Sequence, residues 1–375
     1  MHIFLPSLPR VAREFNTDPA VIQLTVTLYL AGMAAGQLVY GPLSDRYGRR
    51  PVLLWGMVLF IAATIACIAA TTTGQLIAAR IVQSVGACAG MVLCRAMVRD
   101  GVGAEHAATA LAYMSMATVV APGLGPAFGG YIDEWVGWRY TFGGIAALAG
   151  LFLVLAVLTL PETFRNRPPA TSIVRLATDF GRLLRMPVFV GYALCGSIGT
   201  GSFFAMATSM PFLLGEQLHR PTGELGLYFA LISSGFMVGS FIAARLSVRF
   251  GTQRMLIAAM ISAATGALVM LALAGAGIFS VAALLAPFMG VTVSNGINQP
   301  NAISSALGAD PRMIGAASGL YGFIQMASGA LATWSVALFH DGTQFPVVWC
   351  VVICAFSQIA FFMLGRWGQR RRGLA

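Results

Sequence analysis

The chain has 375 residues, of which 58% are hydrophobic and 10% are charged, and its mean hydropathy is +0.79. A soluble globular domain carries about 25% charged residues, so this composition excludes a water-soluble fold and indicates a protein whose solvent is lipid. All 23 basic residues are arginines, and the formal net charge is +10. Because the arginines lie between apolar runs rather than along one face, they indicate topology-setting charge and not a nucleic-acid partner.

Apolar runs long enough to cross a bilayer follow one another along the chain. A spanning helix needs about 20 mostly apolar residues, and the sequence supplies such runs at 20–41, 52–72, 75–96, 107–132, 138–160, 187–214, 223–245, 254–274, 278–303, 313–339 and 345–366. The runs are continuous, whereas the strands of a membrane barrel alternate. We therefore predict an all-α polytopic membrane protein. The opening MHIFLPSLPR resembles the last turns of one further helix, so we expect a twelve-helix protein that lacks most of its first helix.

The arginines predict the orientation of the chain in the membrane. Eighteen lie on the side that holds the segment after residue 41, four lie on the opposite side, and Arg80 lies inside a run. Since loops rich in Arg stay in the cytoplasm, the segment 161–186 and the C-terminus are expected to be cytoplasmic.

The longest polar break, PETFRNRPPATSIVRLATDFGRLLRMP at 161–187, divides the chain in two. Its basic second half is either a helix on the anionic inner leaflet or a plain linker. The two sides repeat weakly, since aligning Gly48 with Gly251 gives an offset of 203 residues, and such repeats are common in transporters. We expect an N-terminal helix bundle at 1–162, a cytoplasmic linker at 163–186, a C-terminal bundle at 187–367 and a basic tail at 368–375.

The most specific motif is GPLSDRYGRR at 41–50. Glycines suit tight turns, an Asp can accept hydrogen bonds from a helix N-terminus or an Arg, and basic residues hold a loop at the inner surface. The residues concerned are Gly41, Asp45, Arg46, Gly48, Arg49 and Arg50.

This motif resembles the loop between the second and third helices of the major facilitator superfamily, whose pattern is G-x-L-x-D-R-x-G-R-R. The resemblance continues through LIAARIVQSVGACAG (76–90), APGLGPAFGGYI (121–132), GWRYTF (137–142), LPET (160–163), QPNAISSAL (299–307) and GAASGLYGFIQMASGAL (315–331), which are similar to the Bcr/CflA group of drug:proton antiporters. It implies two pseudo-symmetric six-helix bundles that move by alternating access. Residues 41–50 would be a gate latch between the halves; a stable basic loop is the alternative.

Two other runs carry an unusual arginine and a glycine-rich stretch. Arg80 lies within an apolar run, where a cation costs at least about 2.5 kcal/mol unless it faces a partner or a wet cavity. The resemblance implies that Arg80 faces the central cavity and couples protonation to transport; a snorkelling or structural arginine is the alternative. Pro126 predicts a bent helix, while Gly125, Gly129 and Gly130 allow a neighbouring helix to approach closely. One expectation is that the two helix bundles rock about this bend. The alternative is that the glycines only allow close helix packing.

Polar and aromatic residues suggest a substrate path. Four amides, Asn295, Asn298, Gln299 and Asn301, cluster around a proline in one run, and amides in hydrocarbon are costly unless they face each other or a cavity. The superfamily places its first, fourth, seventh and tenth helices around the path. We therefore expect these amides to line it, unless they join helices. Phe203, Phe204 and Met206 would form an apolar wall, and Gln325 is a further cavity candidate.

A proton-driven antiporter needs a titratable group, and no acidic residue lies well inside a full run. Bcr/CflA-like proteins usually have an Asp two residues before the Tyr of D-x-Y-L-P. Here Phe4 matches that Tyr and His2 stands at the Asp position. A histidine has an ordinary pKa of about 6.5, so His2 is a weak candidate for proton coupling, unless its place reflects only where the sequence begins.

These observations predict a secondary active transporter that exports drugs or small amphipathic compounds in exchange for protons. The alternatives are a metabolite or amino-acid carrier on the same scaffold, and a truncated membrane protein that does not transport. Scattered His and Cys residues without metal-ligand spacing indicate neither an enzyme nor a metal site, and we expect no cofactor. The expected partners are small amphipathic substrates, protons and the lipid bilayer. By resemblance, the protein would be a monomer in the bacterial inner membrane.

Overall fold

The computed structural model of this protein describes residues 1–163, 173–310 and 313–371, and at residues 99, 101–122, 173–175 and 222 it describes the backbone alone. Within these ranges every regular element is a helix, which confirms the predicted fold class. The elements are η1 (His2–Ser7), α1 (Leu8–Glu14), α2 (Pro19–Tyr47), α3 (Arg49–Ala69), α4 (Thr73–Trp135), α5 (Trp138–Thr159), α6 (Ile173–Leu184), α7 (Pro187–Met210), η2 (Pro211–Gln217), α8 (Thr222–Phe250), α9 (Thr252–Gly275), α10 (Val281–Leu307), α11 (Ile314–Leu338) and α12 (Phe345–Arg371).

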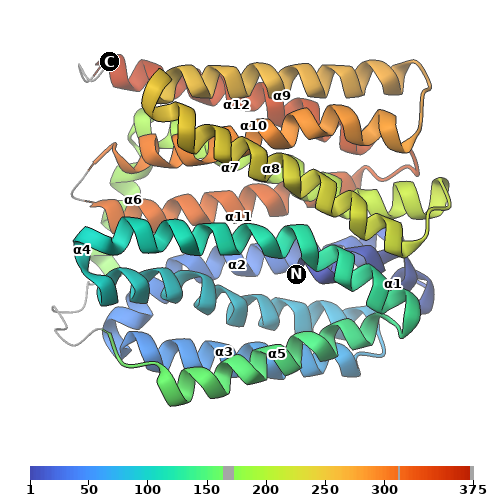
Figure 1. The fold of residues 1–375 in the computed structure, drawn as a ribbon, viewed down its shortest axis with the longest axis horizontal. Coiled ribbons are helices and arrows are strands. Elements are labelled where there is room, and N and C mark those ends of the chain that lie inside the picture. Colours follow the sequence, from blue (N-terminus) through green and yellow to red (C-terminus); the bar gives the residue numbers. More distant parts are fainter. Residues whose placement is uncertain (164–172, 311–312, 372–375) are drawn as a thin grey trace.

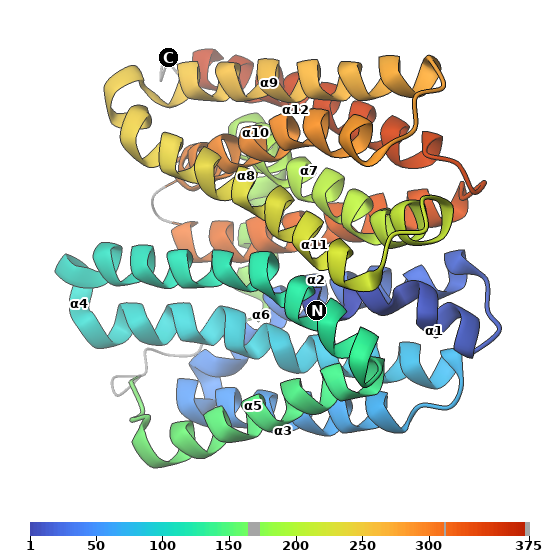
Figure 2. The same ribbon diagram turned by 45° about the vertical axis from the view of Figure 1, so that its right-hand side comes forward.

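The helices extend beyond the apolar runs that predict them. For example, α2 continues to Tyr47 and α8 to Phe250, because a helix satisfies its own backbone hydrogen bonds and needs no apolar side chains outside the bilayer. The runs 75–96 and 107–132 both belong to the 63-residue element α4, which doubles back as two antiparallel arms (Figures 1 and 2). A straight helix of that length would measure about 95 Å, roughly three times the hydrocarbon thickness. The reversal therefore lets each arm cross the membrane.

The surface of the helices is suited to lipid. Nine helical stretches among the described residues are long and apolar enough to span a membrane. In α5 only Trp138, Thr141 and Phe142 are buried, while bulky residues such as Leu151 and Phe152 are exposed. Exposed apolar side chains in such number indicate contact with hydrocarbon rather than water.

The helices form two groups that correspond to the two sides of the sequence repeat. Figure 1 shows α1–α5 in one group and α7–α12 in the other, with α2 packed on α11 and α4 on α8 across the seam. Both α2 and α8 are 29 residues long. Each is followed by a glycine in the left-handed region, Gly48 at φ 99° and Gly251 at φ 81°, which other residues adopt only with strain. The predicted offset of 203 residues therefore pairs helices of equal length and turns of equal shape.

The segment between the two groups is partly helical. α6 contacts α7 and α11, and its Leu183 is fully buried. These contacts favour a docked helix over a plain linker at this point. Residues 164–172 of the predicted linker and residues 372–375 of the predicted basic tail lie outside the described ranges.

The buried apolar residues differ at the two ends of the molecule. We call them the α1 end, where η1, α1 and η2 lie, and the α6 end, where α6 and the turns at Gly48 and Gly251 lie (Figure 1). At the α1 end one core joins both groups, since it contains Val26, Leu30 and Phe142 together with Met206 and Met210. At the α6 end the larger clusters stay within a group: the buried residues of one come from α2–α4, and those of the other from the segment beginning at α6. Among the described residues, the largest apolar core shared by the two halves therefore lies at the α1 end, while farther toward the α6 end α2 and α11 still touch, where Gln37 Nε2 donates a hydrogen bond of 3.2 Å to the Gly322 carbonyl.

Candidate functional site: a cavity between the two halves

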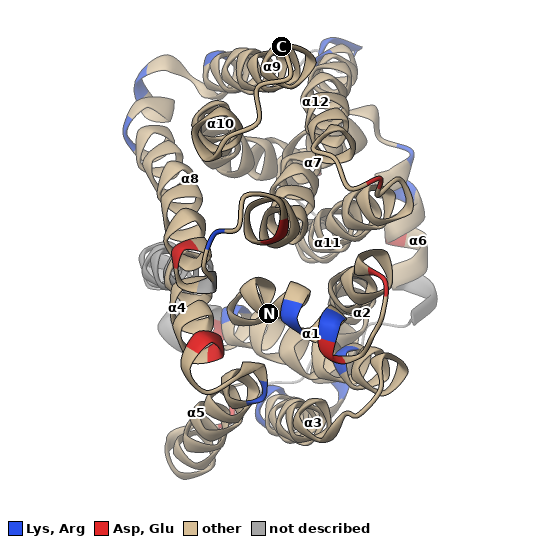
Figure 3. Cartoon of the chain, turned by 90° about the vertical axis from the view of Figure 1, so that its right-hand side faces the viewer, with Lys and Arg blue, Asp and Glu red and all other residues tan. Residues whose placement is uncertain are grey.

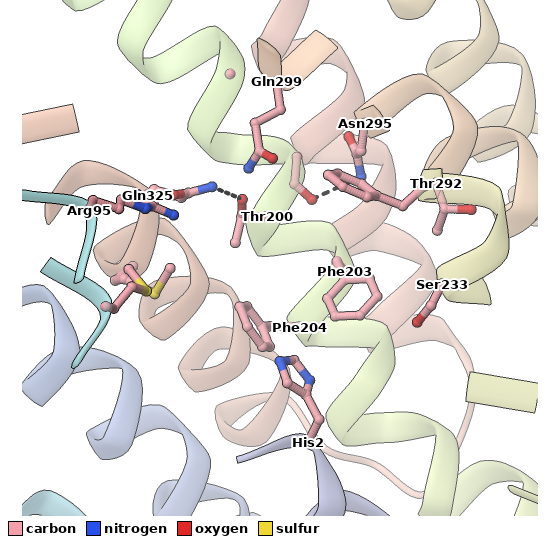
Figure 4. A pocket seen from close by; sticks show the side chains of 15 residues that line it. His2, Arg95, Thr200, Phe203, Phe204, Ser233, Thr292, Asn295, Gln299 and Gln325 are labelled. Atoms are coloured by element: carbon pink, nitrogen blue, oxygen red, sulfur yellow. Dashed lines mark hydrogen bonds between the residues drawn. The ribbon is translucent and has the colours of Figure 1, made fainter. Parts of the chain in front are cut away.

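A cavity of about 260 Å³ lies between the two groups of helices (Figure 4). Three lining residues come from the first half, namely His2 of η1 and Met91 and Arg95 of α4, and the others come from α7, α8, α10 and α11. The shared core lies between this cavity and the α1 end, since Phe204 belongs to the core and also lines the cavity. The geometry thus provides a site for a small molecule at the seam where the halves meet.

The structure brings six of the predicted site residues to this cavity, namely His2, Phe203, Phe204, Asn295, Gln299 and Gln325. Gln325 Nε2 donates a hydrogen bond of 3.2 Å to Thr200 Oγ1. The Asn295 amide donates to the Gly199 carbonyl at 3.0 Å. The His2 ring stacks on Phe204 with centroids 5.8 Å apart, and its Nδ1 atom is buried without a described hydrogen-bond partner. A proton-coupling role for His2 stays a prediction.

Three predicted path residues lie elsewhere. Met206 is fully buried in the shared apolar core. Asn298 joins helices, because its amide donates to the Cys195 carbonyl at 2.8 Å and to Gln358 Oε1 at 3.0 Å. Asn301 donates to the Ile297 carbonyl of its own helix. Contrary to the expectation, Asn298 and Asn301 therefore do not line this cavity. They make hydrogen bonds within and between helices, which was the alternative.

Helical periodicity explains how the amide cluster divides. At 3.6 residues per turn, Asn295 and Gln299 are four residues apart and share a face, and that face lines the cavity. Asn298 and Asn301 are three apart on another face of α10, which turns toward α7 and α12. The spacing in the sequence therefore predicts that the four amides lie on two faces of α10, but it does not predict which face lines the cavity.

Arg80 is enclosed by aromatic rings and does not line the cavity. Its residue is 1% exposed, and its guanidinium carbon lies 4.3 Å from the ring centroid of Tyr29, 5.3 Å from that of Phe4 and 5.7 Å from that of Phe142. Nη1 donates to Gln83 Oε1 at 2.6 Å. This burial contradicts the snorkelling alternative and corrects the expectation that Arg80 faces the cavity. Its proton-coupling role stays a prediction.

Arg95 also lines the cavity, although the sequence predicted for it only a role as a charge that sets topology. Its side chain lines the cavity. A signal for it was present: Met91 lies eleven residues, or about three helical turns, after Arg80, and Arg95 lies one turn further along nearly the same stripe of α4. The other lining residues that were missed are Met91, Gly196, Gly199, Thr200, Ser233, Phe236, Thr292 and Met326.

The predicted gate loop is mostly helix. Residues up to Tyr47 belong to α2 and Arg49 begins α3, so the turn is the single residue Gly48. Gly41 lies inside α2 and does not make the turn that was expected of it. The helix continues through Pro42 as well as Gly41 and ends only at Gly48.

The charged residues of this motif form contacts within the first half. Arg49 is buried and pairs with Asp45 at 2.7 Å and with Asp100 at 3.2 Å. The Arg50 guanidinium donates to the Val157 carbonyl at 2.8 Å, and the Arg46 guanidinium lies over the Tyr47 ring. A latch between the two halves stays a prediction.

Glu162 is a second residue whose role the sequence did not reveal. Its two carboxylate oxygens accept hydrogen bonds from the backbone N–H groups of Arg49 and Arg50, at 3.1 and 3.2 Å. These are the first N–H groups of α3, which otherwise lack acceptors, and the helix dipole favours a negative charge at this position. Glu162 therefore ties the end of the α5 segment to the start of α3.

Replacing Glu162 with Ala should lower the free energy of unfolding by about 1 kcal/mol, the usual cost of losing a helix cap. Glu162→Gln should lose less, because an amide oxygen still accepts one of the hydrogen bonds. The measurement is thermal unfolding of the purified protein in detergent. Equal stability of all three proteins would contradict the capping role.

The glycine-rich motif of α4 lies against η1 and α8. A Cβ atom on Gly129 would lie 1.8 Å from the Ile3 carbonyl oxygen, whereas one on Gly125 would lie 3.6 Å from the Ile3 nitrogen. Gly130 is buried. A Cβ atom on Gly226 of α8 would lie 2.9 Å from the Pro126 carbonyl oxygen. The motif thus provides close helix packing, and a hinge at Pro126 stays a prediction.

Polar contacts join the two halves at the α1 end, the face shown in Figure 3. Arg13 of α1 pairs with Glu216 of η2 at 3.6 Å, although both groups are exposed, so the pair contributes little stability. The backbone N–H of Gly223 donates to Glu134 at 3.2 Å. Together with the shared apolar core, these contacts close the seam at this end.

Comparisons with known proteins agree with this architecture. The family model of the Major Facilitator Superfamily matches residues 1–333. The chain is 28% identical to the bicyclomycin resistance protein homolog of Haemophilus influenzae over 99% of this chain and 94% of that protein. It is 30% identical to multidrug resistance protein D of Escherichia coli over 91% and 85%, respectively.

Solved structures of transporters share the fold. A bacterial homolog of the human lysosomal transporter Spinster, in an inward-facing unoccupied conformation, superposes with a TM-score of 0.74 at 14% identity over 97% of this chain and 93% of that one. A D-xylose–proton symporter gives a TM-score of 0.72 at 17% identity over 96% and 93%. From the two halves of helices, the cavity at their seam and these matches, we conclude that the chain is a multi-pass membrane transporter that belongs to the Major Facilitator Superfamily.

Proposed function

We propose that this protein exports drugs or other small amphipathic compounds across the bacterial inner membrane in exchange for protons, by alternating access. The observation that carries the proposal is the cavity at the seam, which the shared apolar core separates from the α1 end while the clusters at the α6 end stay within their own halves. A site between two halves whose largest shared core lies on one side of it fits alternating access.

The arginine distribution supports an orientation in which the α6 end faces the cytoplasm, since the segment 161–186 and the turns at Gly48 and Gly251 lie on the Arg-rich side. In that orientation the shared apolar core lies on the outer side of the cavity, which supports access from the cytoplasm. The contacts of Arg49 with Asp45 and Asp100, all within the first half, fit a latch that is released when the cavity is accessible from the cytoplasm.

The names of the similar proteins support a drug as the cargo. They include a bicyclomycin resistance homolog, a chloramphenicol resistance protein of Pseudomonas aeruginosa and multidrug resistance proteins. The cavity supports the same class, because its lining combines the aromatic rings of Phe203 and Phe204 with the amides of Gln299 and Gln325, a mixture typical of sites for small amphipathic ligands.

The test is uptake of radiolabelled chloramphenicol into inverted membrane vesicles that acidify their interior. We expect uptake that depends on this protein and collapses when a protonophore removes the gradient. Thr200→Trp, which places an indole in the cavity, should abolish uptake, whereas Arg245→Gln on the exposed surface of α8 should leave it unchanged.

Uptake that persists at full rate with the protonophore would contradict proton coupling. Equal uptake by the Thr200→Trp protein, shown to be folded, would contradict transport through this cavity. Accumulation of a metabolite or amino acid instead of the drug would favour the alternative carrier.

A further inference from the structure

The described lining of the cavity carries a positive charge and no negative one. Of its fifteen lining residues, Arg95 carries a full positive charge, and none is an aspartate or glutamate. Among the residues whose side chains the structure describes, Arg95 has no ion pair or hydrogen bond, whereas Arg49 at the same end of the molecule is paired with two carboxylates. A guanidinium that opens into a site without a counter-ion among the described side chains is available to an anion from outside.

The Arg95 guanidinium and two of the amides lie apart from the aromatic rings, although Ser233 and Thr292 lie on the Phe203 side (Figure 4). Figure 4 shows Arg95, Gln325, Thr200 and Gln299 on one side, and His2, Phe203 and Phe204 on the other. Gln325 is held by its hydrogen bond to Thr200, which fixes the amide next to the position that a ligand would take. The polar side thus offers donors from a guanidinium and from primary amides.

The apolar side is an aromatic wall. Phe203 and Phe204 meet edge to face with centroids 5.5 Å apart, the His2 ring stacks on Phe204, and Phe236 lines the same cavity. Such a wall accepts a flat ring system, and a volume of about 260 Å³ accommodates a small ligand such as a fused ring pair with a short head group.

We infer that the cavity selects amphiphiles with an anionic head, a carboxylate above all, and an aromatic body, with Arg95 holding the head and the rings of Phe203 and Phe204 holding the body. A guanidinium binds a carboxylate through two parallel hydrogen bonds, and the low dielectric of the seam strengthens that pair. This inference rests on the proposed export function and narrows its cargo.

Cationic amphiphiles are the competing class. The rings of Phe203 and Phe204 could attract a cation through their faces, but Arg95 in the same cavity repels it, and none of the lining residues that the structure describes is a carboxylate that would offset that repulsion. The arginines that surround the α6 end add to the unfavourable field for cations and draw anions toward the opening.

The test is calorimetric binding of three matched probes to the purified full chain in detergent at pH 7 and low salt. The probes are 1-naphthylacetate, 1-naphthylacetamide and 2-(1-naphthyl)ethylamine, which share a ring system and carry a negative, a neutral and a positive head. We expect the acetate to bind about tenfold or more tightly than the amine, the value of one charge-assisted hydrogen bond.

Variants at Arg95 test its role separately from folding. Arg95→Gln should remove the preference for the acetate and leave the acetamide affinity unchanged, while Arg95→Lys should retain part of the preference because the charge remains. Arg245→Gln removes an exposed arginine of α8 that stacks on Phe241 outside the cavity, so it should bind all three probes as the native protein does.

Tightest binding of the amine, or an acetate preference that survives in Arg95→Gln, would overturn the inference. Because binding needs no transport, the two proposals fail separately. An acetate preference without gradient-dependent vesicle uptake of either 1-naphthylacetate or chloramphenicol would overturn the export function and uphold the site, whereas drug uptake together with an amine preference would do the reverse.

Discussion

Gly129→Ala should destabilise the protein by about 2–3 kcal/mol, the upper part of the range for inserting a methyl group into a packed interior. The new Cβ atom would lie 1.8 Å from the Ile3 carbonyl oxygen and 2.7 Å from its carbonyl carbon. Both are backbone atoms of η1, so no side chain can rotate away and the whole segment must shift. That segment also carries His2 and Phe4, which contact Phe204 and Arg80, so transport should fall as well.

Gly125→Ala is the matched control. It lies one helical turn earlier and faces the same segment, but its Cβ atom would meet Ile3 at 3.6 Å, an ordinary contact. Because alanine favours a helix by up to about 1 kcal/mol over glycine, this variant should be as stable as the native protein or slightly more so.

The free cysteines provide the measurement. Cys67, Cys88 and Cys195 are among the five that are buried, and none is in a disulfide, so a thiol-reactive dye reports unfolding as the temperature rises. If both variants unfold at the native temperature, the close approach of α4 to η1 is wrong. If both unfold early, the glycines matter for a reason other than this contact.

Much of the fold follows from the sequence, because it depends on local properties. An apolar run of sufficient length must become a helix in lipid, so each predicted run is helical, although the runs 75–96 and 107–132 share α4. The offset between Gly48 and Gly251 likewise reflects a local requirement, a positive φ after each of two 29-residue helices. The boundaries are less certain, since the charged ends of α2 and α8 carry no apolar signal.

The site is less predictable because it depends on contacts between distant segments. Glu162 caps α3 across more than one hundred residues, and nothing near LPET in the sequence points to that partner. Arg95 ends an apolar run, where an arginine usually marks the membrane surface. Only the tertiary structure, in which α4, α7 and α11 line one cavity, gives it a different place.

Arg80→Met should reduce proton-driven uptake at least tenfold while leaving the fold intact. Methionine fills a similar space among the rings of Tyr29, Phe4 and Phe142, and removing the charge also removes the cost of burying it. Arg80→Ala should instead lose about 2–5 kcal/mol of stability, because it leaves a void in a closed core. Comparing the two variants therefore separates the effect of the Arg80 charge on transport from the effect of its side-chain volume on stability.

The measurement is vesicle uptake with and without a proton gradient, together with dye-monitored unfolding of each protein. A role in coupling requires that Arg80→Met unfolds like the native protein, binds ligand, and still fails to use the gradient; Arg254→Met, at an exposed arginine of α9, should behave as the native protein does. If Arg80→Met accumulates the drug at the native rate, the buried cation has no part in coupling and the aromatic enclosure is structural. In that case the search for the proton-carrying group moves to His2, which stacks on Phe204 in the cavity.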